Sequence, residues 1–266
     1  TLLNIENLIG SDFADTLGGG AGSETIAAGA GDDILLGSGG ADVLDGGAGV
    51  DTVSYAVSGA GVTAYLDGRA GSGGDASGDT YANVEWLTGS GFNDTLIGDF
   101  TDDRIDGGAG DDLIEGAGGD DTLLGNAGND TIRGGDGADS IDGGAGTDTV
   151  SYDDSTSGVT ARLDGLAGSG GTALGDVLSN VETLQGSIYA DTLIGDGNAN
   201  TLNGGDGDDI LVGGAGADAL IGGNDFDTAD YSSSSAGVTV GVDGSVGSGG
   251  DAAGDLLSFR PAGRAH

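Results

Sequence analysis

Large apolar residues recur at every ninth position through three stretches of the chain. In residues 89–151, Leu96, Ile105 and Leu123 lie on this spacing, and each follows an aspartate by two positions. Glycines fill most positions before the aspartate, as in GGAGDDLIE at 107–115. Glycine permits positive φ and tight turns, whereas one apolar residue between polar neighbours suits a short strand. Each unit therefore predicts a six-residue turn and a three-residue strand whose apolar side chain points inward.

Two such units make one coil of eighteen residues, so the loops at positions i and i+18 lie on the same side, one strand spacing apart. The same nine-residue grid runs through residues 10–54 and returns at 186–230. Repeats of this kind are typical of solenoids. The sequence predicts an all-β fold, a parallel β-roll or β-solenoid of stacked GGxGxDxUx coils.

The segments between the tracts form a second, longer repeat. Residues 54–89 match residues 151–186, and the pattern begins again at Tyr231. Apolar and polar residues alternate in GVTAYLD and NVEWL, as in strands, with a glycine-rich loop between them. We expect each spacer to be a wider coil that continues the same stack. The predicted organisation is the end of a preceding spacer at 1–9, tracts at 10–54, 89–151 and 186–230, spacers at 55–88 and 152–185, a partial spacer at 231–258, and a divergent tail at 259–266.

The amino-acid composition limits which ligands this protein can bind and which reactions it can catalyse. The formal net charge is −39, with 45 acidic residues against 6 basic ones, so nucleic-acid binding is excluded by repulsion from the phosphates. There is no cysteine, the only histidine is His266, and no apolar run is long enough to span a membrane. We expect no catalytic residues and no enzyme activity in this chain. Of the acidic residues 40 are aspartates, and tight turns or close oxygen ligation are the physical reasons to prefer the shorter side chain.

Stacked carboxylates repel one another unless a cation lies between successive loops. Calcium suits such a ladder because it accepts six to eight oxygens in flexible geometry, whereas magnesium demands stricter octahedra. Counting the i, i+18 pairs gives roughly eleven calcium sites as an upper estimate. The predicted metal ligands are Asp15, Glu24, Asp33, Asp42, Asp51, Asp94, Asp103, Asp112, Asp121, Asp130, Asp139, Asp148, Asp191, Asp209, Asp218 and Asp227. Glu24, and Asn200 on the same grid, depart from the pattern, so we expect weaker or empty sites there.

Two alternatives stay open for the aspartates. Those in the tracts could cap turns through hydrogen bonds to the backbone, but capping does not explain why like charges recur at a spacing that forces them together. Equivalent aspartates in the spacers could hold a further metal or close a loop by hydrogen bonding, and we favour hydrogen bonding. They are Asp67, Asp164 and Asp243 at one position, and Asp79, Asp176 and Asp255 at another.

The unit GGxGxDxUx resembles the RTX, or haemolysin-type, calcium-binding nonapeptide repeat, and seventeen copies in register make the resemblance specific. It implies a slice of a bacterial protein exported unfolded by type I secretion, which folds in extracellular calcium. We therefore expect a secreted, extracellular or cell-surface location. The uncleaved carboxy-terminal export signal of the family is not recognisable in FRPAGRAH.

Two roles follow from this resemblance. The first is a structural, adhesive or surface-matrix module whose partners are calcium ions, with self-association or a cell-surface or matrix partner open. The second is the non-catalytic accessory and secretion region of a larger secreted enzyme or toxin, such as a protease, lipase or alginate epimerase. For either role we expect folding driven by Ca²⁺, because the apolar area of one nonapeptide does not offset the entropy of ordering nine residues.

Overall fold

The computed structural model describes residues 5–258, and these divide into two units. Within the described residues, unit 1 runs to Thr131 and includes Gly144–Gly146, and unit 2 comprises Ile132–Gly143 and the residues from Thr147 onward. The predicted tail 259–266 and the first four residues of the predicted segment 1–9 lie outside the described residues.

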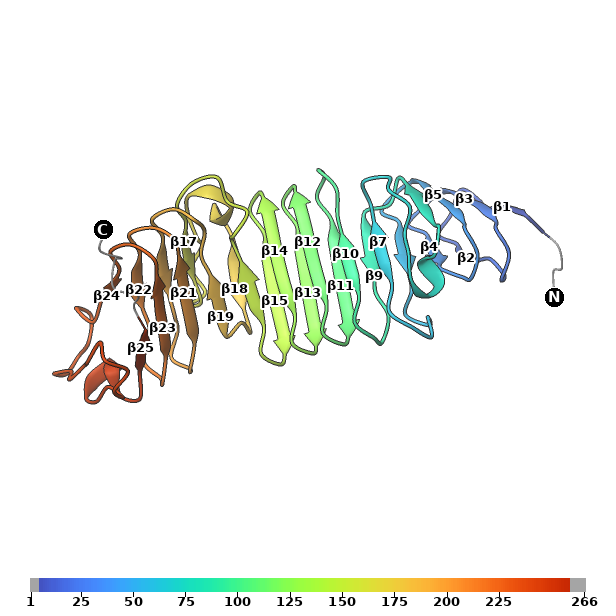
Figure 1. Ribbon diagram of the computed structural model, residues 1–266. Coiled ribbons are helices and arrows are strands. Elements are labelled where there is room, and N and C mark those ends of the chain that lie inside the picture. Colours follow the sequence, from blue (N-terminus) through green and yellow to red (C-terminus); the bar gives the residue numbers. More distant parts are fainter. Residues whose placement is uncertain (1–4, 259–266) are drawn as a thin grey trace, which may run out of the picture. The chain divides into compact units, whose positions relative to one another are not determined.

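Unit 1 consists of short parallel strands in three stacks, which Figure 1 colours from blue to green. One stack has the order β1-β3-β5-β8, the second β2-β4-β6-β9-β11-β13, and the third β7-β10-β12. The strands are β1 Asn7–Ile9, β2 Thr16–Gly18, β3 Thr25–Ala30, β4 Ile34–Leu36, β5 Val43–Ala48, β6 Thr52–Ser54, β7 Thr63–Tyr65, β8 Thr80–Ala82, β9 Trp86–Thr88, β10 Thr95–Ile97, β11 Arg104–Ala109, β12 Leu113–Gly118 and β13 Thr122–Ala127.

Unit 2 repeats this arrangement. Its stacks run β14-β16-β19-β21-β23-β25, β15-β18 and β17-β20-β22-β24. The strands are β14 Thr131–Asp136, β15 Ser140–Ala145, β16 Thr149–Ser151, β17 Thr160–Arg162, β18 Val177–Ser179, β19 Thr183–Gln185, β20 Thr192–Ile194, β21 Thr201–Gly205, β22 Ile210–Val212, β23 Ala219–Gly223, β24 Thr228–Ala229 and β25 Leu256–Ser258. Sheets built only from parallel strands, in coils of eighteen residues, confirm the predicted β-roll in each unit.

Strand pairing follows the predicted register. Ile105 of β11 pairs with Leu123 of β13, and Leu202 of β21 pairs with Leu220 of β23, both eighteen residues apart. The central apolar residue is fully buried in most of these strands, because alternate side chains of a strand point to opposite faces, whereas Leu17 of β2 and Ala229 of β24 are only partly buried. The core of each unit is therefore a file of single Leu, Ile and Val side chains between the stacks.

Several strands are longer than the three residues predicted. β3, β5 and β11–β15 have six residues, because the first glycines of the next turn continue the pairing, as Gly108 does with Asn126. The chain then turns through positive φ at Gly108 and Gly110, where φ is 98° and 118°. Such angles are strained for residues with a β-carbon, which explains the glycines at these two turn positions.

The spacers are wider coils that pair with the tracts on either side, as predicted. In unit 1 the strand offsets are 37 residues from Val43 to Thr80 and 34 residues from Thr52 to Trp86. The spacer of unit 2 repeats them, with Ser140 paired to Val177 and Thr149 paired to Thr183. The boundaries given for tracts and spacers stay predictions.

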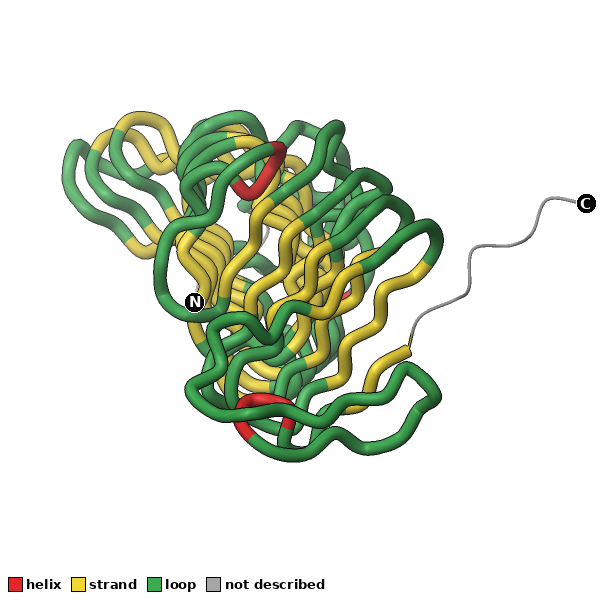
Figure 2. Tube along the Cα trace, turned by 90° about the vertical axis from the view of Figure 1, so that its left-hand side faces the viewer, coloured by secondary structure: helices red, strands yellow, loops and turns green. Residues whose placement is uncertain are grey.

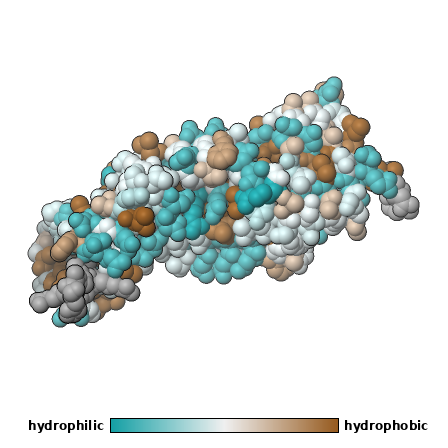
Figure 3. All heavy atoms as spheres, turned by 45° about the horizontal axis from the view of Figure 1, so that its top comes forward, coloured by the Kyte–Doolittle hydropathy of each residue, from teal (hydrophilic) through white to brown (hydrophobic). Residues whose placement is uncertain are grey.

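Three short 3₁₀ helices were not predicted from the sequence. They are η1 Gly74–Ala76, η2 Gly171–Ala173 and η3 Gly250–Ala252, one in each glycine-rich spacer loop, and they appear in red in Figure 2. Each buries one alanine completely. No helix in residues 5–258 is long and apolar enough to cross a membrane. On the face shown in Figure 3, hydrophobic residues lie in small groups among hydrophilic ones.

Candidate metal sites

The loop aspartates form ladders within each unit. The backbone N–H of Asp94 donates to Oδ1 of Asp112 at 2.7 Å, and that of Asp112 donates to Oδ1 of Asp130 at 2.8 Å. The predicted i, i+18 stacking is therefore present. The same bond joins Asp15 to Asp33, Glu24 to Asp42, Asp33 to Asp51, Asp103 to Asp121, Asp191 to Asp209, Asn200 to Asp218, and Asp209 to Asp227.

This bond from the N–H of the preceding coil, the ladder bond, uses only one oxygen of each carboxylate. The second oxygen takes no part in it. In several loops of the described part this second oxygen is buried and has no hydrogen-bond partner. It is Oδ2 of Asp33, Asp51, Asp112, Asp209, Asp218 and Asp227. Oδ1 of Asp103 is also buried without a partner, but the other oxygen of Asp103 accepts the N–H of Asp99 at 2.8 Å rather than a ladder bond. Leaving a buried charged oxygen without a partner costs far more than a typical hydrogen bond contributes. These oxygens therefore point to a missing positively charged partner.

A backbone carbonyl converges on the same point as the carboxylate oxygen. A β-carbon added to Gly107 would lie 2.5 Å from Oδ2 of Asp112 and 3.0 Å from the carbonyl oxygen of Gly125. In unit 2, a β-carbon at Gly204 would meet Oδ2 of Asp209 and the carbonyl oxygen of Gly222. We call this space, beside the first glycine of a loop, the cradle. Carboxylate and carbonyl oxygens are the ligands that calcium prefers, so the residues fit that ion.

Burial disfavours the ionised form of the ladder carboxylates. It raises the pKa of Asp103, Asp112 and Asp209 to about 7 and that of Asp218 to about 6, from an ordinary value of 3.8. The backbone hydrogen bonds oppose this shift, while neighbouring carboxylates add to it, among them Asp94 and Asp130 for Asp112. A divalent cation in the cradle would offset both the desolvation cost and the repulsion.

Some ladder carboxylates have further donors from the protein. Ser90 donates its backbone N–H to Oδ2 of Asp94 at 2.5 Å and its hydroxyl to Oδ1 at 2.8 Å. Ser187 does the same for Asp191, and Ser11 donates both its N–H and its hydroxyl to Oδ2 of Asp15. The hydroxyl of Ser38 bonds Oδ2 of Asp42 at 3.0 Å. These four aspartates stay predicted ligands, but the structure gives them a partner that the sequence pattern did not indicate.

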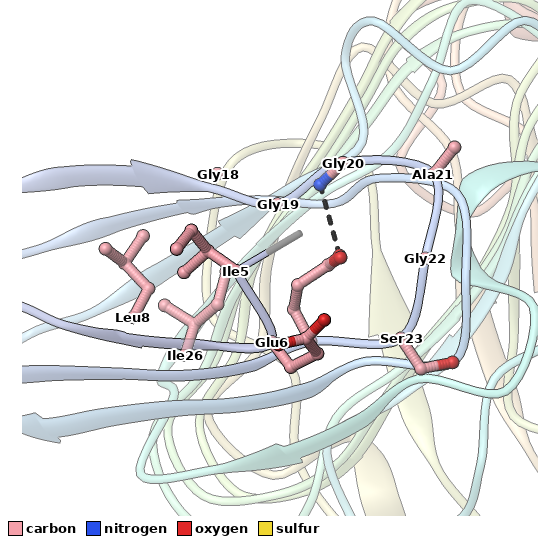
Figure 4. Close-up of a pocket in the computed structure, with 11 residues that line it drawn as sticks. Ile5, Glu6, Leu8, Gly18, Gly19, Gly20, Ala21, Gly22, Ser23 and Ile26 are labelled. Atoms are coloured by element: carbon pink, nitrogen blue, oxygen red, sulfur yellow. Dashed lines mark hydrogen bonds between the residues drawn. The ribbon is translucent and has the colours of Figure 1, made fainter. Parts of the chain in front are cut away.

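The two residues that depart from the pattern also have donors. Glu24 accepts the N–H of Gly20 at Oε2, at 3.1 Å, beside a cavity of about 640 Å³ bordered by Gly19 and Ile26 (Figure 4). A β-carbon at Gly19 would lie 2.6 Å from the same oxygen, so the carboxylate of the longer glutamate lies in the cradle beside Gly19. Asn200 accepts the N–H of Asp196 at 2.9 Å. The N–H four residues earlier makes the same bond to Asp94 and Asp103, so weaker binding at Glu24 and Asn200 stays a prediction.

Residues of the spacers also accept ladder bonds. Two of them are glutamates, which the sequence analysis did not predict. The N–H of Asp51 donates to Oε2 of Glu85, and that of Asp148 to Oε2 of Glu182, both at 2.9 Å across 34 residues. The equivalence of Glu85 and Glu182 in the spacer repeat was the available signal. A fixed nine-residue spacing could not find them, because the wider coil changes the offset.

The spacer aspartates take hydrogen bonds, as expected. The hydroxyls of Tyr55, Tyr152 and Tyr231 donate to Asp79, Asp176 and Asp255. Burial raises the pKa of Tyr152 well above 10, so its hydroxyl is a neutral donor. The other spacer position is exposed. There Asp67 pairs with Arg69 at 2.7 Å, Asp164 pairs with Arg162 at 2.5 Å, and Asp243 accepts the N–H of Ser245.

The remaining predicted ligands are buried in their ladders. Asp121, Asp130, Asp139 and Asp148 are each no more than 1% exposed. Among the described residues, no three or more His, Cys, Asp or Glu side chains form a cluster that could hold a metal ion. A calcium ion here would thus be bound by few carboxylates together with backbone carbonyls from successive loops.

Comparison with known families agrees with this geometry. The model of the RTX calcium-binding nonapeptide repeat (4 copies) matches residues 18–53, 82–114, 115–150, 179–211 and 194–229, which is more than half of the chain. The chain belongs to the RTX calcium-binding nonapeptide repeat family. RTX repeats bind calcium, and the buried aspartate pattern fits such sites. No curated protein matches the sequence.

Proposed function

We propose that this RTX chain is an extracellular structural module that folds when calcium fills its ladders. The observation that carries the proposal is the recurrence of a buried, unpartnered carboxylate oxygen facing a carbonyl oxygen of the next loop on the same side. Asp112 with Gly125 in unit 1 and Asp209 with Gly222 in unit 2 are examples. The ligands we assign to calcium are the predicted loop aspartates with such an oxygen.

Electrostatics supports coupling of folding to calcium. Stacked strands lie about 4.8 Å apart, and at about 5 Å with an effective dielectric constant of about 20, two like charges repel by roughly 3 kcal/mol. The repulsion recurs at each rung, and most half coils of the tracts contribute only one fully buried Leu, Ile or Val to the core. Binding free energy for a site that exists only in the folded state is also folding free energy. Without calcium we therefore expect an expanded chain.

An extracellular location agrees with the calcium concentration that such sites require. Extracellular calcium-binding modules work at 10⁻⁴ to 10⁻³ M, a range at which ladders of modest affinity fill. Secretion is also what the RTX family implies. A chain that stays unfolded at low calcium and becomes rigid outside the cell is suited to a structural, adhesive or matrix role, with calcium as its ligand.

The test is folding monitored with and without the ion. Far-ultraviolet circular dichroism and small-angle scattering of the 266-residue chain are recorded in excess chelator, then across a calcium titration, with magnesium as the control ion. We expect a disordered spectrum in chelator, a strand spectrum in millimolar calcium, and several calcium ions per folded chain by metal analysis. A strand-rich, compact chain in excess chelator at pH 8 would contradict the proposal.

A further inference from the structure

Three spacer aspartates occupy the ladder position at the end of a tract. Oδ1 of Asp79 accepts the N–H of Asp42 at 2.8 Å, as ladder aspartates do, although 37 residues separate them. In unit 2, Asp176 accepts the N–H of Asp139 and Asp255 that of Asp218, both at 3.0 Å and over the same 37 residues. All three aspartates are buried.

The ladders stop at these residues. The N–H that would bond the next carboxylate instead donates to a carbonyl of the neighbouring 3₁₀ turn, from Asp79 to Ala76 at 3.2 Å. Asp176 and Asp255 make the same bond to Ala173 and Ala252, at 3.4 Å. Each of these aspartates is thus the last carboxylate of its ladder.

The second oxygen of each last carboxylate has a neutral partner. Oδ2 accepts the hydroxyl of Tyr55 at 2.6 Å in Asp79 and that of Tyr152 at 3.0 Å in Asp176. Tyr231 donates in the same way to Asp255 at 2.7 Å. The separation from tyrosine to aspartate is 24 residues in all three cases. In ladder residues such as Asp112 the corresponding oxygen has no partner.

In the first spacer the tyrosine also fills a cradle. Gly37 begins the loop of Asp42 as Gly107 begins the loop of Asp112, but a β-carbon at Gly37 would strike the ring of Tyr55. The Tyr55 hydroxyl also lies 2.6 Å from that of Tyr81, so a second neutral group joins the hydrogen bonds that end on Asp79. The ring therefore stands where the other loops leave space for a cation.

We propose that Tyr55, Tyr152 and Tyr231 are metal-free end caps, whose hydroxyls take the place of calcium at the last carboxylate of these three ladders. The caps determine where the row of calcium sites ends. They let a tract finish on a buried aspartate without a further ion. This inference rests on the proposed calcium ladders.

Tyr152 offers the cleanest test, because its hydroxyl donates to Asp176 and its ring is retained in phenylalanine. The full chain is compared as wild type, Tyr152→Phe, Asp176→Asn and the double variant. Tyr189→Phe is the matched control, since Tyr189 is 42% exposed in the same unit. Two quantities are measured: the calcium concentration at half folding by circular dichroism, and the number of calcium ions per folded chain by metal analysis.

We expect Tyr152→Phe to weaken the folding equilibrium roughly tenfold or more at saturating calcium, because a buried carboxylate oxygen loses its donor. Asp176→Asn in the same chain should recover most of this loss, since both partners are then uncharged or absent. A gain of one bound ion in Tyr152→Phe would also support the cap, because a cation would then take the vacated place. If the single variant fails to fold while the double variant folds, the cap is supported as well.

Three results would overturn the inference. Tyr152→Phe could behave like Tyr189→Phe in both measurements, it could bind fewer ions than wild type, or Asp176→Asn could give no relief. The last result would mean that the hydroxyl of Tyr152 does not act through Asp176. A wild-type chain that folds without calcium would instead contradict the proposed function, so the two failures are distinguishable.

Discussion

Filling one cradle with a methyl group tests the calcium ladder most directly. Gly107→Ala places a β-carbon 2.5 Å from Oδ2 of Asp112 and 3.0 Å from the carbonyl oxygen of Gly125, and it keeps every carboxylate. Gly107 has no positive φ, so the substitution adds no backbone strain. The methyl group and a calcium ion cannot share this space.

The expected loss follows from the state in which Asp112 is left. A pKa of about 7 in place of 3.8 means that ionising this carboxylate without a cation costs on the order of 4 kcal/mol at pH 8. Losing one site also removes about 2.7 kcal/mol of stabilisation at a calcium concentration 100 times its dissociation constant. The two figures estimate the same loss and are not added. We therefore expect Gly107→Ala to lower the free energy of unfolding by about 3 to 4 kcal/mol in calcium.

The assay is urea unfolding in calcium, with metal analysis of the folded chain. Gly91→Ala is the matched control, because a β-carbon there meets nothing within 4 Å and Gly91 also lacks positive φ. We expect the control to stay within about 1 kcal/mol of wild type and to keep its calcium. If Gly107→Ala binds as many ions as Gly91→Ala and unfolds at the same urea concentration, the cradle at Gly107 does not hold calcium.

Three further predictions concern pH, the core and ion selectivity. In chelator, the carboxylates whose folded pKa is raised to about 6 or 7 bind more protons in the folded than in the unfolded chain, so the free energy of unfolding rises as pH falls from 8 towards 4. Circular dichroism in chelator should therefore show more strand at pH 5 than at pH 8. An unchanged spectrum would argue against buried carboxylates. Leu123→Ala removes a fully buried side chain from the core of unit 1 and should cost 2 to 5 kcal/mol in calcium, measured by urea unfolding, whereas the exposed Leu166→Ala should cost less than about 1 kcal/mol. Magnesium at the concentration where calcium gives complete folding should leave the chain largely unfolded by circular dichroism, because it requires octahedral geometry that carboxylates and carbonyls of stacked loops do not impose; equal folding in both ions would refute calcium selectivity.

Much of the candidate site follows from local repetition. Every copy of the unit has the same length, so once two units close one coil, the pairing of Ile105 with Leu123 and the bond from Asp94 to Asp112 follow from an offset of eighteen residues. The aspartate at a fixed distance from an inward apolar residue then lies in the loop. For these reasons the nine-residue spacing predicted the roll, the apolar core and the ladder partners.

Where the coil widens, spacing along the chain no longer indicates proximity. Only the closed spacer brings Asp42 to Asp79 across 37 residues and Asp51 to Glu85 across 34, because its loop length and 3₁₀ turn determine how far the chain travels before it returns. The nine-residue unit also gives Asp94 and Asp112 the same place, yet Ser90 donates to both oxygens of Asp94, whereas Oδ2 of Asp112 has no hydrogen-bond partner. The sequence by itself determined the coil and its repeating charges, because they are properties of one unit. Tertiary structure decided which carboxylate oxygens keep a cradle and which meet a hydroxyl, because that depends on the neighbouring coil.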